Sequence, residues 1–161
     1  MTATRHAETR IVPYTADLMY RVVADVEQYP KFLPWVVALR VLSRSDYGQR
    51  ETLNAEMAVG YGALREKYTS RVLLDPEART IDVTQTNGPF RVLENHWRFT
   101  PQERGCKVDF SLADEFKSRV LNAVAGAAYG KVYTKMADAF VERARVLSDL
   151  EKLSDQPMKQ V

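Results

Sequence analysis

The chain has 161 residues, of which 45% are hydrophobic and 27% charged, and its formal net charge is +2. This composition is typical of one ordinary globular domain and argues against extensive disorder. The net charge is too small to indicate a nucleic-acid-binding protein by itself. One cysteine and two distant histidines exclude an internal disulfide and give no support for a structural zinc site.

The N-terminal residues and the lengths of the apolar runs indicate where in the cell the protein is expected. No apolar run approaches the ~18 residues that a membrane-spanning helix needs, and residues 1–8 lack the apolar centre of a signal peptide. We therefore expect a cytoplasmic protein that contacts the inner membrane at most peripherally. A single domain over residues 1–149 and a polar tail over residues 150–161 are expected.

The N-terminal part predicts one strand and two short helices. A strand over residues 9–12 ends at Pro13, and Thr15 is suited to cap a helix whose apolar residues recur at helical spacing. Residues 28–35 follow, with two prolines that leave room for one helical turn. This connector is unusually apolar, so it forms either a buried plug or the entrance of a pocket that touches a membrane. The residues of this connector that would form the plug or the entrance are Phe32, Leu33, Pro34 and Trp35.

From residue 36 to residue 113, apolar and polar residues alternate with a period of two. Turn residues interrupt the alternation near residues 47–48, 60–62, 75–76, 87–89 and 101–105. Six strands joined by hairpins are expected. Such alternation is typical of an antiparallel sheet with one buried face, because a parallel sheet would need crossover helices.

Residues 118–147 carry apolar side chains at steps of three and four, which predicts one amphipathic helix about 45 Å long at ~1.5 Å per residue. Small residues fill positions 123–130, either for close packing on a sheet or to leave space for a ligand. The elements together predict an α+β fold. A curved seven-stranded antiparallel sheet would wrap around this C-terminal helix, with two short helices between the first two strands.

Alternation places Glu66 on the inner face with Leu64 and Tyr68. A buried carboxylate needs a partner or a raised pKa. Glu66 would therefore hold a ligand headgroup or a water, or make a structural hydrogen bond to a neighbouring strand or to Asn95. The residues expected to line a ligand cavity are Met57, Val59, Glu66, Tyr68, Asn95, Trp97, Val124, Ala128 and Val132.

No catalytic constellation is visible in the sequence. Cys106 has no histidine near it in sequence, and no phosphate-binding glycine loop, paired-carboxylate motif or metal cluster occurs. The acidic spots at residues 25–27 and 114–115 are interpreted as solvated ends of elements. We expect a protein that is not an enzyme and has no metal, with a cyclase-type enzyme as the lesser alternative.

Basic residues alternate toward the outer face of the predicted sheet. A solvated face is the simple interpretation, and an anionic lipid surface or ribosomal RNA are the functional ones. No DNA partner is expected. The residues are Arg40, Arg65, Lys67, Arg71, Arg91, Arg98 and Lys107.

Four segments carry a resemblance to a known family: Ala24–Trp35 (ADVEQYPKFLPW), Leu64–Val72 (LREKYTSRV), Gly88–Phe90 (GPF) and Leu93–Phe99 (LENHWRF). In this order they resemble the coenzyme Q-binding, START-like family of the polyketide cyclase and lipid-transport superfamily, over roughly residues 9–147. This family includes bacterial proteins named as ribosome association toxins.

The resemblance implies a helix-grip fold and a function. Members of the family are understood to bind ubiquinone, without a catalytic reaction, in support of respiratory electron transfer. The expected partner is ubiquinone or another isoprenoid lipid, which is a bound ligand and not a cofactor. A ribosome-binding growth inhibitor is the alternative that the same family implies.

Overall fold

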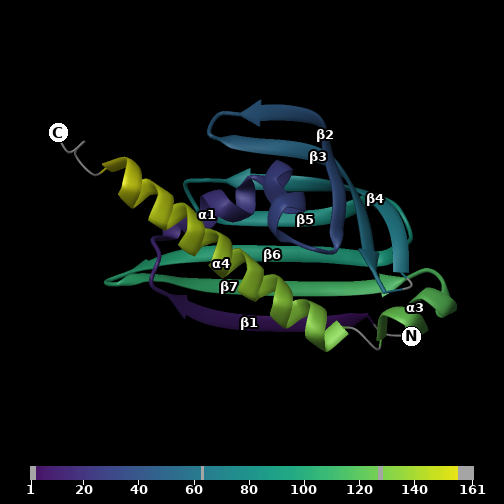
Figure 1. Cartoon of the computed structure of the whole chain (residues 1–161). Coiled ribbons are helices and arrows are strands. Elements are labelled where there is room, and N and C mark those ends of the chain that lie inside the picture. Colours follow the sequence, from purple (N-terminus) through teal and green to yellow (C-terminus); the bar gives the residue numbers. More distant parts are fainter. Residues whose placement is uncertain (1–2, 63, 127–128, 156–161) are drawn as a thin grey trace.

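In the computed structural model, residues 3–62, 64–126 and 129–155 are described. Figure 1 shows one sheet with the long C-terminal helix lying obliquely across it. The elements in chain order are β1 (Thr4–Val12), α1 (Ala16–Ala24), the 3-10 helix η1 (Val26–Gln28), α2 (Tyr29–Phe32), β2 (Val36–Tyr47), β3 (Arg50–Tyr61), β4 (Leu64–Asp75), β5 (Thr80–Asn87), β6 (Phe90–Gln102), β7 (Gly105–Phe116), α3 (Arg119–Gly126) and α4 (Tyr129–Asp155).

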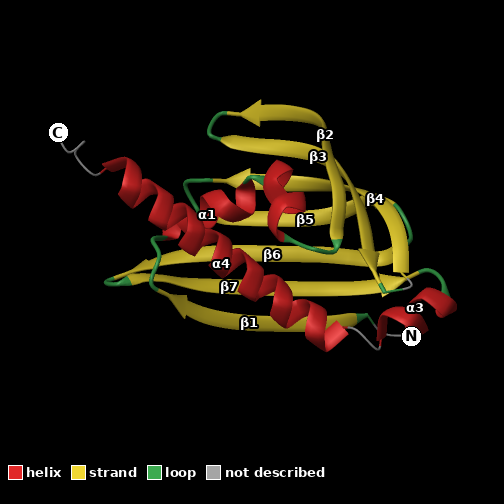
Figure 2. Ribbon diagram, in the orientation of Figure 1, coloured by secondary structure: helices red, strands yellow, loops and turns green. Residues whose placement is uncertain are grey.

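The described strands form one antiparallel sheet in the order β1-β7-β6-β5-β4-β3-β2. Strands β2 to β7 are consecutive neighbours, and β1 pairs with β7, so the first strand joins the last at one side of the sheet. Figure 2 shows the sheet curving around the helices on its inner side. The predicted α+β architecture with a curved seven-stranded sheet is confirmed.

Strand β1 begins earlier than the sequence indicated. Pairing with β7 starts at Thr4, opposite Asp114, and continues to Val12, opposite Cys106. The prediction of a strand from residue 9 is therefore wrong by five residues. Backbone hydrogen bonds to β7 extend the strand through residues whose side chains are mostly exposed, so hydrophobic alternation gave little signal there.

Helix α1 forms for the reasons that the sequence gives. The Thr15 hydroxyl accepts a hydrogen bond from the Leu18 backbone N–H at 3.1 Å, which caps the helix. Asp17 lies in the first turn, where it suits the helix dipole. The apolar face of α1 packs against α4 and β6. Its buried residues are Ala16, Leu18, Met19, Val22 and Val23.

The predicted single helix over residues 118–147 is divided into α3 and α4. Residues 127 and 128 lie outside the described residues. Helix α3 ends at Gly126 and α4 begins at Tyr129, so both of these ends fall within the small-residue segment. Each glycine costs a helix about 1 kcal/mol relative to alanine, so this segment is the weakest part of the pattern.

Residues 150–155, predicted to belong to a polar tail, continue α4. An ion pair at 2.9 Å between Arg21 of α1 and Glu151 lies beside this extension. Arg145 pairs with Glu142 and Asp149 along the same helix. Charged residues with high helix propensity and such pairs sustain a helix in water without apolar burial, although each exposed pair contributes little.

Most of the buried core lies between α1, α4 and the inner sheet face, and its largest members include Met19, Leu53, Ile81 and Phe99. A second cluster of Phe90, Phe116 and Ala125 lies near α3. Among the described helices, none combines the length and apolar character that crossing a membrane requires.

Candidate functional site

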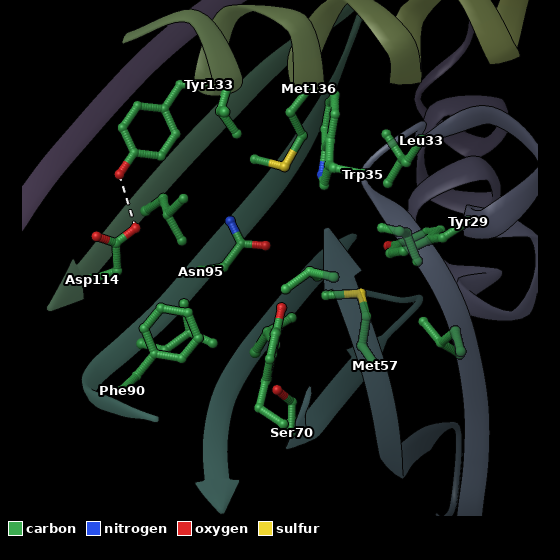
Figure 3. A pocket seen from close by; sticks show the side chains of 18 of the residues that line it. Tyr29, Leu33, Trp35, Met57, Ser70, Phe90, Asn95, Asp114, Tyr133 and Met136 are labelled. Atoms are coloured by element: carbon green, nitrogen blue, oxygen red, sulfur yellow. Dashed lines mark hydrogen bonds between the residues drawn. The ribbon is translucent and has the colours of Figure 1, made fainter. Parts of the chain in front are cut away.

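A cavity of about 230 Å³ lies between the inner face of the sheet and helices α3 and α4. Figure 3 shows side chains from the sheet, from the connector before β2 and from α4 projecting into it. Most of its wall is apolar, which suits a hydrophobic ligand. Apolar side chains in the wall include Leu39, Ala55, Val72, Val83, Leu112 and Phe140.

The structure brings most of the predicted cavity residues together. Strand alternation placed the predicted sheet residues other than Glu66 at the cavity, and helical spacing placed Val124 and Val132 there. Of the predicted set, the following line the cavity: Met57, Val59, Tyr68, Asn95, Trp97, Val124 and Val132. Ala128, predicted to form the roof, lies outside the described residues.

Glu66 is the exception among the described residues of that set. It follows Leu64 on the same strand face and lies opposite Val59, yet it is not part of the cavity wall. Its side chain is partly exposed near the β3–β4 turn. Because an unpaired carboxylate is costly to bury, partial solvation at this end of the strand is the favourable arrangement. The prediction that Glu66 lines the cavity is therefore wrong.

The connector between α1 and β2 forms part of the wall. Leu33 is 2% exposed and lines the cavity together with Trp35. Phe32 packs edge-on against Phe140 of α4, with ring centroids 5.4 Å apart. Of the four predicted entrance residues, Pro34 alone is exposed. The structure thus supports a plug more than an open entrance here, and membrane contact by this segment stays a prediction.

Asn95 and Trp97 form a hydrogen-bonded pair on β6. The Trp97 indole N–H donates to the Asn95 side-chain oxygen at 2.8 Å. The Asn95 amide in turn donates to the Ser111 backbone oxygen on β7 at 2.9 Å. The hydrogen bond between Glu66 and Asn95 that the sequence left open is therefore replaced by these two. They fix the orientation of an amide and an indole in the cavity wall.

Asp114 is one of several cavity residues that the sequence did not predict, together with the polar residues Ser70 and Tyr133. It is 4% exposed and lines the cavity from β7. The Tyr133 hydroxyl of α4 donates a hydrogen bond to Asp114 Oδ2 at 2.9 Å (Figure 3). The interpretation of residues 114–115 as a solvated end is wrong, because Glu115 is also buried and lies 3.7 Å from Arg91. Continuing the alternation of Cys106, Val108, Phe110 and Leu112 by one step would have placed Asp114 inside.

The ring of Tyr133 packs against a side chain of strand β1. Its ring stacks on the His6 ring with centroids 4.9 Å apart. His6 Nε2 lies 3.2 Å from a carboxylate oxygen of Glu8 on the same strand. Strand β1 therefore supports the α4 side chain that binds Asp114.

Two hydroxyl groups on β4 complete the polar part of the wall. Ser70 is 5% exposed, and its Oγ has no hydrogen-bond partner among the described residues. Tyr68 packs its ring against Phe90, with centroids 5.2 Å apart. Burial and then the negative charge of Asp114 raise the pKa of Tyr68, so its hydroxyl stays protonated and able to donate.

The outer face of the sheet is mixed in charge. Arg40 and Lys67 both lie near the Glu56 carboxylate, at 3.4 Å and 3.8 Å. Arg98 of β6 lies opposite Asp109 of β7 in the register. The outward direction of the basic residues was predicted correctly, but acidic partners between them reduce any continuous positive surface.

Other reactive side chains give little indication of catalysis. Within residues 3–62, 64–126 and 129–155, no group of three or more His, Cys, Asp or Glu side chains is placed to hold a metal ion. Cys106 is fully buried, and burial raises the pKa of its thiol. A thiol with a raised pKa is a poor nucleophile, so this cysteine is part of the core.

Comparison with known proteins identifies the family. Residues 12–141 match the family described as polyketide cyclase / dehydrase and lipid transport. The chain belongs to this family. The ribosome association toxin RatA of Pseudomonas aeruginosa is 33% identical over 146 residues, which cover 90% of this chain and 98% of that protein. The mitochondrial coenzyme Q-binding protein COQ10 of Drosophila melanogaster is 33% identical over 144 residues, which cover 87% of this chain and 58% of that protein.

Solved structures of the same fold agree with this membership. An 18 kDa protein from Caulobacter crescentus is 39% identical, with a TM-score of 0.76, over 91% of this chain and 99% of that one. A START superfamily protein from Mycobacterium smegmatis is 20% identical, with a TM-score of 0.75, over 89% and 98% of the two chains. The second similarity concerns the fold alone, and it confirms the predicted START-like helix-grip.

Proposed function

We propose that this chain binds a lipid quinone, most favourably ubiquinone, in the cavity between α4 and the sheet and carries it without a chemical reaction. The supporting observation is an apolar cavity with a few polar side chains: Tyr68, Ser70, Asn95 and Asp114. A quinone offers a flat ring, two carbonyl oxygens and an isoprenoid tail, which this combination suits. The similarity to a protein named for coenzyme Q binding supports the same choice.

The cavity has an outlet at the surface for the tail of a long ligand. Val124 of α3 lines the cavity and is also 40% exposed, so the wall reaches the surface there. We expect the tail to leave beside Val124, toward a membrane surface.

Binding without reaction is favoured by how the polar side chains are used. Asn95, Trp97 and Tyr133 each donate to another protein group in the wall. Side chains engaged in this way keep the shape of a cavity and orient a ligand. A cyclase-type activity, the alternative from the family, would show as turnover of a polyketide substrate.

Intrinsic fluorescence provides a direct test. The chain has two tryptophans, and both, Trp35 and Trp97, line the cavity. A quinone inside the cavity should quench them saturably, whereas collisional quenching by free quinone rises without saturation. Titration with a short-chain ubiquinone should therefore saturate, and organic extracts of protein purified from cells should contain quinone by mass spectrometry. Unsaturable quenching together with extracts free of quinone and other lipids would reject the proposal.

Ribosome binding is the second candidate, because the P. aeruginosa relative named RatA matches over 98% of its own length. The mixed charge of the outer face gives it less support than the cavity gives lipid binding. Co-sedimentation with ribosomes should separate the two readings. Purely electrostatic attachment to RNA weakens steeply as the salt concentration rises. Ribosome binding that survives moderate salt would therefore support this function. Binding that disappears after a small increase in salt would not.

A further inference from the structure

We propose that Ser70 anchors the ring of the quinone at the inner end of the cavity, through a hydrogen bond from its hydroxyl to a ring oxygen, and that the tail runs from there toward α3. This inference rests on the proposed function. It adds the orientation of the ligand and one residue that fixes it. It needs no reaction in the cavity.

The Ser70 hydroxyl is buried where the protein gives it no partner. The residue is 5% exposed and lines the cavity, and its Oγ makes no hydrogen bond with any described residue. A buried hydroxyl without a partner costs free energy, which is why such groups are rare in native proteins. Alanine would occupy the same place on the strand without this cost. A ligand oxygen that reaches the hydroxyl explains its presence.

The strands on either side of β4 do not supply the missing partner. Ala55 of β3 lies opposite Ser70 in the register and has no polar side-chain atom. Gln85 of β5 lies opposite on the other side, but Phe90 occupies both ends of its amide. Gln85 Nε2 donates to the Phe90 backbone oxygen at 2.8 Å, and Oε1 accepts from the Phe90 backbone N–H at 3.0 Å. The hydroxyl therefore stays available to a ligand.

Several other polar side chains of the wall already bind protein groups. The Trp97 indole donates to Asn95, and the Tyr133 hydroxyl donates to Asp114. Figure 3 shows Ser70 apart from the bonded pair of Asp114 and Tyr133. A group that is already bonded gains less from a ligand oxygen than a group without a partner does. The Ser70 hydroxyl is thus better suited than these groups to anchor a ring.

The order of residues along β4 gives the direction of the ligand. Leu64 and Tyr68 pack against the second cluster, near α3. Val72 and Leu74, beyond Ser70, belong to the main core, and Leu74 is no longer part of the cavity wall. Ser70 therefore lies toward the inner end of the cavity, roughly 20 Å along the strand from Leu64 at ~3.3 Å per residue.

The outlet lies at the opposite end of this path. Val124 of α3 both lines the cavity and is 40% exposed, and α3 packs against the Leu64 end of β4. A quinone with its ring at Ser70 therefore places its tail along apolar wall residues up to the surface. The reverse orientation would bury the tail against the main core and leave the ring oxygens at the outlet, so the Ser70 hydroxyl would stay unsatisfied.

Tryptophan quenching by a short-chain ubiquinone measures the anchor in the full chain. Ser70→Ala should bind the quinone about five- to tenfold more weakly, because one neutral hydrogen bond is lost. The ligand-free variant should melt at the same or a higher temperature, because the unsatisfied hydroxyl is gone. Unchanged affinity, or a lower melting temperature of the ligand-free variant, would overturn the inference and leave the proposed function intact. No binding by the unaltered protein would reject both.

An oxygen-free ligand separates the hydrogen bond from a general loss of fit. Durene, a tetramethylbenzene, has a similar ring without the oxygens, so in an NMR titration it should bind Ser70→Ala and the unaltered protein equally. Ser43→Ala is the matched control, because Ser43 is exposed and accepts from Asn54 at 2.8 Å outside the cavity wall. Its quinone affinity should be unchanged. Durene binding that falls as much as quinone binding in Ser70→Ala would contradict the anchor.

A nitroxide label at the end of the tail of a short-chain ubiquinone tests the orientation. Because paramagnetic broadening falls steeply with distance, the label should broaden the amide NMR signals around Val124 more than those of Ser70 and Ala55. The strongest broadening at Ser70 would show the reverse orientation and overturn the inference.

Discussion

The hydroxyl of Tyr133 on α4 donates to the carboxylate of Asp114 on β7 across 2.9 Å, and each residue is 4% exposed. This bond links the covering helix to the sheet at the wall of the cavity. Most other contacts of α4 with the sheet are apolar and so carry little directional information. A buried, directional bond therefore contributes to where the helix sits above the cavity.

Removing this bond should destabilise the fold. Tyr133→Phe leaves the buried Asp114 carboxylate without one donor, and we expect the free energy of unfolding to fall by about 1–3 kcal/mol. Urea unfolding followed by circular dichroism measures it. Tyr47→Phe is the matched control, because Tyr47 is 70% exposed, and it should change stability by less than about 0.5 kcal/mol. Equal effects of the two variants would show that the bond contributes nothing.

The pair of Asn95 and Trp97 makes a second prediction about stability. Asn95→Ala removes the acceptor of the Trp97 indole N–H, and Trp97 is 4% exposed. An unsatisfied buried donor costs about 1–3 kcal/mol. The Trp97 emission should also shift, because its polar neighbour is lost. A variant as stable as the unaltered protein would mean that water replaces the Asn95 oxygen.

Filling the cavity should block the ligand and spare the fold. Ala55 of β3 is 5% exposed and lines the cavity, so Ala55→Leu occupies space that the ligand ring needs. We expect quinone affinity to fall by about tenfold or more, the equivalent of ~1.4 kcal/mol. The melting temperature should stay the same or rise, since filling a cavity is commonly stabilising.

The control for this change lies on β2. Ala38 is exposed, and Ala38→Leu adds the same side chain without entering the cavity. Its quinone affinity should match that of the unaltered protein, by tryptophan quenching. Normal binding by Ala55→Leu would place the ligand elsewhere on the molecule.

Glu66 should have little influence on the ligand. Because its side chain is outside the cavity wall and partly exposed, Glu66→Gln should alter quinone affinity by no more than about twofold, as surface changes do. Fluorescence titration of this variant beside Ser70→Ala measures the difference. A loss of binding in Glu66→Gln as large as in Ser70→Ala would restore the interpretation that alternation suggested.

Stability should decline at alkaline pH. Burial raises the pKa of Tyr29 and Tyr68 in the folded protein, with a further contribution to Tyr68 from Asp114. An unfolded tyrosine ionises near pH ~10, so above that pH the unfolded chain loses these protons first and becomes relatively more stable. The stability is therefore fully present below pH ~10 and is lost above it, by up to ~1.4 kcal/mol per pH unit for each residue.

Urea unfolding at several values between pH 8 and pH 11 should reveal this slope. Tyr68→Phe should make the slope shallower, with the share of Tyr29 remaining, whereas Tyr47→Phe should leave it unchanged, because Tyr47 is exposed. An unchanged slope in Tyr68→Phe would show that another group causes the decline.

The sequence by itself determined the α+β fold and part of the cavity wall. Period-two alternation put Met57, Tyr68 and Trp97 on the inner face, and the Thr15 cap fixed the start of α1. These features are local consequences of strand and helix geometry, so counting along the chain was sufficient. The separated family segments agreed with the architecture.

Only the tertiary structure decided which inner-face carboxylate lies at the cavity. Alternation assigns Glu66 and Asp114 to the same kind of position, but Glu66 lies near the β3–β4 turn and keeps contact with water. Asp114 is covered by α4 and accepts a hydrogen from Tyr133. The free-energy cost of burying a carboxylate depends on the partners that other elements bring. Those partners come from α4 and, through His6, from β1, both far from Asp114 in sequence.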